Sequence, residues 1–192
     1  MKTEDMRISL IKSTIHTISN VGIDRATTKL LAGNAGLNEV YIYRIFGGKV
    51  ELFYETFTYI DKQFASHLLK CFHSMKNSNE TVRNKFYNGF SQIWEFALSD
   101  TETCSFFIRY YYSRYYTKQC SEAREKIYHK VMIAISEIFK EGTNTWWLFN
   151  YILDVIFASA VKVLRDEMPN DEQTAENVFS LLYAALESHL KQ

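Results

Sequence analysis

Four basic side chains in a short, glycine-rich stretch are the clearest chemical feature of the sequence. Between residues 25 and 49 the single carboxylate is that of Glu39, against the four cations of Arg25, Lys29, Arg44 and Lys49. This segment therefore carries a net charge of +3, whereas the whole chain of 192 residues has a formal net charge of +0. A local cluster of cations suits contacts with nucleic-acid phosphates. The segment predicts a phosphate-binding surface.

Short helices must position these side chains. Five of the seven glycines lie between residues 22 and 48, where they can end or turn helices. Apolar residues at helical spacing predict a first helix over residues 3–21, along the stripe of Ile8, Ile11, Ile15 and Ile18. Gly22 then supplies a left-handed stop.

Cap residues define the next two elements. Thr27 or Thr28 can cap a second helix that ends at residue 34, and Gly36 permits a tight turn. Asn38 can cap a third helix that reaches residue 46 and would direct its first turn, with free backbone donors, towards a major groove. This is a helix-turn-helix, which by itself fits a DNA-binding unit and a packing hairpin equally well.

The detailed residues favour DNA binding. A specific resemblance to the DNA-binding signature of the TetR family of transcriptional regulators is carried by GIDRATTKLLAGNAGLNEVYIYRIFGGKVELF. The residues in register are Gly22, Thr27, Thr28, Ala32, Ala35, Gly36, Leu37, Tyr43, Phe46, Lys49 and Leu52. The resemblance covers residues 7–57, and the remainder resembles the family in its layout of long helices. It implies an all-α repressor, with a helix-turn-helix DNA-binding domain over residues 1–48 and a helical ligand-binding and dimerisation domain over residues 49–192.

The resemblance also implies roles for single side chains. Base edges would be read by Lys29, Glu39, Val40 and Tyr41. Phosphates would be held by Thr28, Tyr43 and Lys49, with Arg44 as an additional clamp. Together with Thr27 and Asn38 these residues form the predicted DNA-binding set. The set departs from the family pattern at Glu39, Val40 and Tyr41, so it does not predict an operator sequence. Tyr43 could instead pack inside, as we expect for Phe46.

Longer helices are predicted beyond this unit. One begins at Lys49 and carries Leu52, Phe53, Phe57, Ile60 and Phe64. Others are expected from Asn79 to an interruption at Asp100, and over residues 101–116, 121–140, 144–167 and 171–189. Asn170 and Gln173 resemble a capping box for the last of these.

Aromatic residues are concentrated in the middle of the chain. Twelve of the thirty rings lie between residues 86 and 116, more than one helix face can bury. Surplus rings can line a cavity for a small effector, or they can form a core with an exposed rim. The candidate ligand-binding residues are Phe90, Trp94, Phe107, Tyr110 and Tyr111, and a planar apolar or a cationic compound is the expected ligand.

The two C-terminal helices predict a dimer. The segment 144–167 is apolar around most of its circumference, and Val178, Leu181, Leu182 and Ala185 continue the pattern. Such helices can pack on their own domain and on a second copy. A two-fold homodimer would bind a near-palindromic operator.

Other classes of protein fit the sequence less well. Three unpaired cysteines and an N-terminus without a secretory pattern favour the cytoplasm. Residues 146–164 are long enough to span a membrane, but Asp154 and Lys162 argue against it. His67 and Cys71 lie one turn apart without a second ligand pair, so no metal or cofactor is predicted. An enzyme, or a helical interaction module without DNA binding, remains the alternative.

Overall fold

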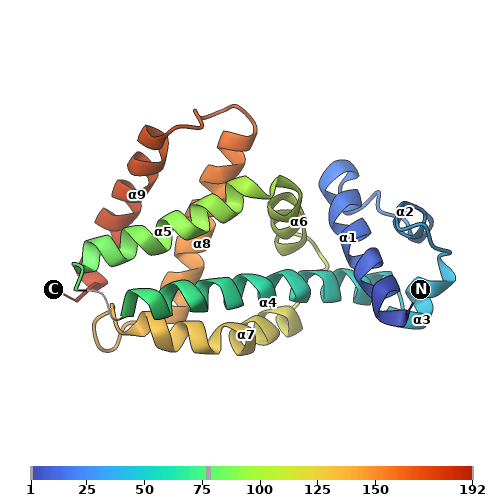
Figure 1. Cartoon of the computed structure of the whole chain (residues 1–192), viewed down its shortest axis with the longest axis horizontal. Coiled ribbons are helices and arrows are strands. Elements are labelled where there is room, and N and C mark those ends of the chain that lie inside the picture. Colours follow the sequence, from blue (N-terminus) through green and yellow to red (C-terminus); the bar gives the residue numbers. More distant parts are fainter. Residues whose placement is uncertain (1, 77–78, 192) are drawn as a thin grey trace. The chain divides into compact units, whose positions relative to one another are not determined.

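The regular structure of the described residues is helical. The computed structural model describes residues 2–76 and 79–191, and of residues 74–76 it describes the backbone alone. The helices are α1 (Thr3–Val21), α2 (Thr28–Asn34), α3 (Val40–Phe46), α4 (Lys49–Lys76), α5 (Val82–Ser99), α6 (Thr101–Tyr111), α7 (Lys118–Ser136), α8 (Thr145–Leu164) and α9 (Glu172–Leu186), followed by a 3-10 turn at Glu187–His189 (Figure 1). The predicted all-α class is confirmed.

The chain divides into two compact units. The first consists of residues 1–63 and 102–124, and the second of residues 64–101 and 125–192. Two of the three boundaries between the units fall inside α4 and α7, so each of these helices contributes to both units, and the third falls at the start of α6. The resemblance implies a different boundary, at residue 49, between a DNA-binding and a ligand-binding domain. This functional boundary stays a prediction.

The first unit is built around α1. Helices α1, α2 and α3 pack pairwise on one another (Figure 1). Ile11, Ile15 and Ile18 of the predicted stripe are buried, whereas Ile8 is half-buried. A buried hydrogen bond also connects α1 to α2, because Ser13 Oγ donates to the carbonyl of Leu31 at 2.6 Å. This packing holds α2 and α3 on a common support.

Two turns in this unit require glycine. Gly22 has φ +87° after α1, and Gly36 has φ +68° between α2 and α3, a region that side chains with a Cβ rarely adopt. The amide of Leu37 donates to the carbonyl of Ala32 at 2.9 Å, which closes the turn that Gly36 makes. The predicted stop at Gly22 and the tight turn at Gly36 are confirmed.

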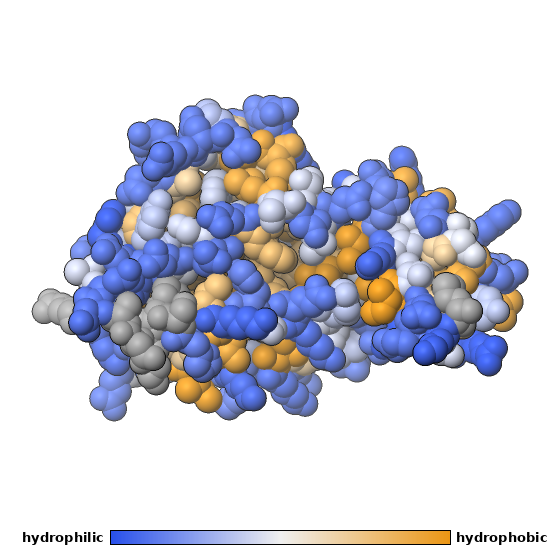
Figure 2. Space-filling model, in the orientation of Figure 1, coloured by the Kyte–Doolittle hydropathy of each residue, from blue (hydrophilic) through white to orange (hydrophobic). Residues whose placement is uncertain are grey.

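The second unit contains the C-terminal helices. Helix α5 packs on α8 and α9, and α8 packs on α9. Within the described residues α8 is the one helix long and apolar enough to cross a membrane, and 44% of its most apolar window is buried inside the protein. The face drawn in Figure 2 is mostly hydrophilic with separate apolar patches. Helix α8 thus resembles the core helix of a bundle.

Helix α6 ends earlier than the aromatic pattern predicts. It stops at Tyr111 rather than at residue 116, because Ser113 Oγ donates to the Tyr110 carbonyl (2.7 Å) and accepts from the Tyr115 amide (3.1 Å). The Tyr110 hydroxyl also donates to the Tyr115 carbonyl at 3.2 Å. These bonds turn the chain, and α7 begins at Lys118 instead of residue 121.

Other predicted helix limits are corrected as well, since α8 ends at Leu164 and α9 at Leu186 rather than at residues 167 and 189. Thr81 caps α5 in place of Asn79, accepting from the amide of Asn84 at 3.2 Å. Asp171 caps α9 in place of the pair Asn170 and Gln173, and its hydrogen bond from the Thr174 amide (2.8 Å) lowers the pKa of the Asp171 carboxyl. Helix α7 ends at Ser136 rather than at residue 140.

A buried ion pair joins α4 to α7 within the first unit. Arg124 Nε lies 3.1 Å from Asp61 Oδ2, and the two side chains are 3% and 0% exposed. The guanidinium also lies over the rings of Phe57, Phe107 and Tyr111, at 5.8, 5.4 and 5.5 Å from their centres. Desolvation of both charges is costly, so each partner depends on the other.

Removal of one partner should therefore destabilise the first unit strongly. We expect Asp61→Ala to lower the free energy of unfolding by about 3–5 kcal/mol, because it leaves a buried cation without its carboxylate. Asp61→Leu combined with Arg124→Leu should recover most of this loss. Urea unfolding followed by circular dichroism measures both. The control is Glu122→Ala, which removes an exposed pair with Lys118 and should cost less than about 1 kcal/mol. Equal effects of the buried and exposed variants would contradict the prediction.

Candidate nucleic-acid interface

Helix α3 presents polar and aromatic side chains to solvent. Its inward residues are Ile42 and Phe46, which are buried. Val40 and Tyr43 point outward, 63% and 56% exposed, and Arg44 is exposed beside them. Positions 40, 43 and 44 share one face because residues three and four apart are neighbours on a helix. The face that the resemblance assigns to DNA is therefore accessible, and Tyr43 does not pack inside.

The remaining predicted DNA-binding residues belong to the same helix-turn-helix and to the start of α4. Thr27, Lys29, Asn38 and Glu39 are exposed, whereas Thr28, Tyr41 and Lys49 are half-exposed. The structure thus leaves all ten side chains of the predicted set within reach of solvent. None of them is buried in the core.

A hydrogen bond connects the two helices of the motif on their outer side. Thr28 Oγ1 donates to Glu39 Oε2 at 2.8 Å. A hydroxyl has one proton, so Thr28 can donate to Glu39 or to a phosphate, and not to both. The same bond holds the Glu39 carboxylate in place while its other lone pairs remain able to accept, for example from a cytosine amine.

The amides at the start of α3 are largely used within the turn. The Val40 amide donates to Asn38 Oδ1 at 3.0 Å. The amides of Tyr41 and Ile42 each donate at 3.0 Å to the carbonyls of Asn38 and Glu39. Asn38 therefore stabilises the first turn, although α3 itself begins at Val40 and Glu39 is its N-cap residue. Contacts with a ligand would come mainly from side chains rather than from these backbone groups.

The basic side chains of the segment differ in their surroundings. Lys29 and Arg44 are exposed, as phosphate contacts require. The Lys49 ammonium lies 5.6 Å from the centre of the Phe53 ring, so α4 orients it. Arg7, which lies outside this segment, is over Phe46 at 5.0 Å and pairs with Glu55, so it serves the packing of the unit.

Two contacts from α6 to α1 escaped the sequence analysis. Arg109 Nη1 donates to the carbonyl of Ile18 at 3.0 Å, which also accepts from the Gly22 amide. A Cβ at Gly22 would lie 3.3 Å from that same Nη1. On the exposed side, His16 Nδ1 lies 2.8 Å from Glu102 Oε1. These residues are far apart in the sequence, so no local pattern could have paired them.

Three of the predicted ligand-binding rings lie in the first unit, and two of them face a cation of the protein itself. Phe107 and Tyr111 stack at 6.3 Å and both face Arg124. Tyr110 is buried against Phe57 at 4.7 Å, and burial raises the pKa of its hydroxyl. The sequence contained a signal for Arg124 that was missed, because it occupies a core position of α7, four residues from Cys120 and from Tyr128, which are both buried.

The other two predicted rings lie in the second unit. Phe90 and Trp94 stack at 5.8 Å on α5 and are both buried. Phe90 also lines a small apolar cavity, together with residues of α4, α7 and α8. The five candidates are thus distributed over the two units rather than gathered in one.

Cys71 and His67, the pair that the sequence placed one turn apart, lie side by side. The Cys71 Sγ is 3.7 Å from His67 Nε2 and 3.5 Å from Gln92 Oε1. Burial raises the pKa of the Cys71 thiol, which disfavours the thiolate that metals bind.

Comparison with known proteins places the fold. The chain matches no protein-family model and no curated protein sequence. Solved structures match over almost their whole length. A TetR family transcription regulator from Marinobacter aquaeolei VT8 is 16% identical, with 95% of each chain covered and a TM-score of 0.78. A similar regulator from Shewanella sp. PV-4 is 14% identical, covering 97% of this chain and 99% of its own, also with a TM-score of 0.78.

A third structure was solved with a bound ligand. The transcriptional regulator FadR from Bacillus subtilis, in complex with stearoyl-CoA, is 16% identical, covers 91% of this chain and 96% of its own, and has a TM-score of 0.69. The likeness found in residues 7–57 therefore extends to the architecture of the whole chain, and the protein has the fold of the TetR-family transcription regulators.

Proposed function

We propose that the protein is a transcriptional repressor that binds a near-palindromic DNA operator as a homodimer and is released by a small effector. The observation that carries the proposal is the outward face of α3. Its side chains are exposed beside a local excess of positive charge, while Ile42 and Phe46 fix the helix from below. A helix held in this way can enter a major groove.

Side-chain chemistry supports roles for the predicted residues. Lys29 can donate to guanine acceptors, Glu39 can accept from a cytosine amine, and Tyr41 can meet a thymine methyl group. Arg44 and Lys49 suit phosphates. Thr28 serves chiefly to hold Glu39, which we infer from their 2.8 Å hydrogen bond.

Exposed apolar side chains on α8 and α9 support the homodimer. Trp147 on α8 is 67% exposed, Leu181 on α9 is 76% exposed, and Tyr151 lies one turn after Trp147 on the exposed face of α8. Large apolar side chains exposed on two adjacent helices are typical of a protein interface. Two copies of this pair would form a four-helix interface with two-fold symmetry.

The effector is a small molecule with apolar character. Of the two ligand classes predicted for the aromatic rings, the arrangement favours an apolar compound, since Arg124 already occupies the cation position between Phe107 and Tyr111. One structure of the same fold was solved in complex with stearoyl-CoA.

We place the protein in the cytoplasm, where its DNA and a soluble effector meet. A helical interaction module without DNA binding is the rival function, and the experiments below separate the two.

Loss of a phosphate contact should weaken DNA binding uniformly across sequences. We expect Arg44→Ala to lower the affinity for duplex DNA and to reduce the slope of log K against log salt by about 0.9, because one fewer counterion is released. Fluorescence anisotropy over a potassium chloride series measures both. Lys126→Ala, on the exposed face of α7, is the matched control and should leave them unchanged. Absence of salt-dependent binding in the unmodified protein would exclude the repressor.

Substitution of Glu39 should alter sequence preference. Gln at this position can still accept from Thr28, but it offers an amide where the carboxylate accepted from a base. We expect Glu39→Gln to change the preferred base at one position of each half-site. The binding free energies of the two bases at that position should differ by about 1–3 kcal/mol. Selection of bound sequences from random DNA, done with both proteins, measures the change. Identical selected sequences would show that Glu39 does not read a base.

A charge on the exposed apolar face should break the dimer. Leu181→Glu places a carboxylate on the proposed interface, where it would be desolvated. We expect sedimentation at micromolar concentration to show a monomer for this variant and a dimer for the unmodified protein. Val50→Glu, at an exposed apolar position of α4, is the control and should remain dimeric. A monomer in every case would contradict the proposed assembly.

A further inference from the structure

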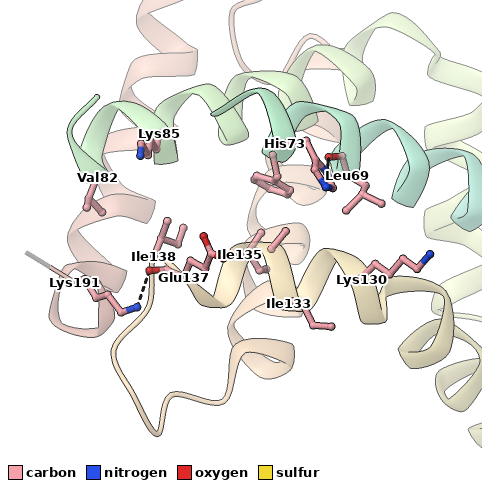
Figure 3. Close-up of a pocket in the computed structure, with 12 residues that line it drawn as sticks. Leu69, His73, Val82, Lys85, Lys130, Ile133, Ile135, Glu137, Ile138 and Lys191 are labelled. Atoms are coloured by element: carbon pink, nitrogen blue, oxygen red, sulfur yellow. Dashed lines mark hydrogen bonds between the residues drawn. The ribbon is translucent and has the colours of Figure 1, made fainter. Parts of the chain in front are cut away.

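The second unit contains a pocket that the aromatic pattern did not predict. It has a volume of about 510 Å³ and lies between α4, α5, α7 and the segment after α9 (Figure 3). Its apolar lining includes Leu69, Phe72, Val82, Ile133, Ala134 and Ile138. Pockets of this size hold small organic ligands.

Positive charge surrounds this apolar lining. Lys85, Lys130 and Lys191 line the pocket, against the single carboxylate of Glu137. Lys191 and Lys130 lie at opposite ends of the view in Figure 3, with Lys85 drawn on the side of Lys191. The chain as a whole has no net charge, so the pocket has a local excess of cations, separate from that of residues 25–49. It complements an anion.

One of these cations is held in position by the backbone. Lys191 Nζ donates to the carbonyl of Glu137 at 2.8 Å, and the Lys191 amide donates to the carbonyl of Ile138 at 2.9 Å. An ammonium group has three donors, so Lys191 can still donate to a ligand. These two bonds fix Lys191 at the edge of the pocket.

A second cavity continues the pocket inward. It is smaller, about 40 Å³, and shares Phe72, Lys85, Ile135 and Ile138 with the outer one. Its further lining is apolar and includes Phe90 and Gly89. A Cβ at Gly89 would lie 3.2 Å from the Phe72 ring, so the glycine allows this ring its position between the two cavities. Three of the shared residues, Phe72, Ile135 and Ile138, provide an apolar path from the outer pocket to the inner cavity.

We propose that this pocket binds a straight aliphatic chain with one anionic end group. The anion lies at Lys85 and Lys191, and the chain extends along Phe72 and Ile138 towards the inner cavity. A carboxylate and a phosphate monoester share this chemistry. As the effector site of the repressor the pocket rests on the proposed function, but binding is measured without DNA, so failure of one does not imply failure of the other.

The binding test uses probes with the same tail and different end groups. Isothermal titration of the full-length protein compares dodecanoate, dodecyl phosphate, dodecanol and dodecyltrimethylammonium, each below its micelle concentration. We expect both anions to bind at least about tenfold more tightly than dodecanol, and the cation most weakly. The tighter anion identifies the end group. Shortening the tail should weaken binding by about fourfold for each buried methylene removed.

Two variants separate the end group from the tail. Lys85→Met keeps the length of the side chain and removes the charge, so the affinity for dodecanoate should fall about tenfold while that for dodecanol is unchanged. Ala134→Phe fills part of the pocket and should weaken both. Lys126→Met, on the same helix as Ala134 but outside the pocket, is the control. Circular dichroism and thermal unfolding verify that each variant is folded.

Three results would overturn the proposal. The first is equal affinity for the anionic and cationic probes, which would indicate unspecific adsorption of tails. The second is unchanged dodecanoate affinity in a folded Ala134→Phe variant. The third concerns Ile133, an exposed apolar residue of the lining. If Ile133→Glu altered self-association in sedimentation without altering dodecanoate binding, the pocket would belong to an interface between copies of the chain.

Discussion

Helix α3 has seven residues, too few for a helix to be stable in water without tertiary contacts. It persists because Ile42 and Phe46 are buried against the other helices of the first unit. The same burial determines which side chains remain outside, since a helix that buries one face must expose the opposite one. The proposed DNA contacts therefore depend on the apolar packing of α3. In addition, the hydrogen bond from Thr28 orients the Glu39 carboxylate.

The ion pair of Asp61 and Arg124 shows how a charged group can be accommodated in an apolar unit. The guanidinium lies over Phe57, Phe107 and Tyr111. Burial raises the pKa of the nearby Tyr116 hydroxyl, although the charge and hydrogen bond of Arg124 act in the opposite direction. Rings that seemed surplus in the sequence thus have an internal partner. The protein uses cation-π contacts to support its own fold. The lysines that line the pocket of the second unit are, in contrast, proposed to bind an external anion.

Local signals in the sequence predicted the N-terminal elements well. Thr27, Gly22 and Gly36 act through hydrogen bonds and φ angles within a few residues, so the limits of α1 and α2 could be predicted. The end of α7 could not, because it depends on Phe139 pairing with Leu190, fifty-one positions away. The same holds for Arg109, whose acceptor is the carbonyl of Ile18. The composition of the candidate interface could be predicted from residues 25–49, whereas the 510 Å³ pocket joins four separate segments and had no local signature.

Two main-chain hydrogen bonds attach the segment after α9 to the end of α7, beside two bonds from the Nζ groups of Lys140 and Lys191. The amide of Lys140 donates to the carbonyl of His189, and the amide of Lys191 donates to that of Ile138, each at 2.9 Å. Main-chain bonds of this kind form with almost any side chain at these positions. A change of charge at position 191 would accordingly remove the hydrogen bond from Lys191 Nζ to the Glu137 carbonyl but leave both main-chain bonds in place. Ligand preference and structural integrity are separable at this edge of the protein.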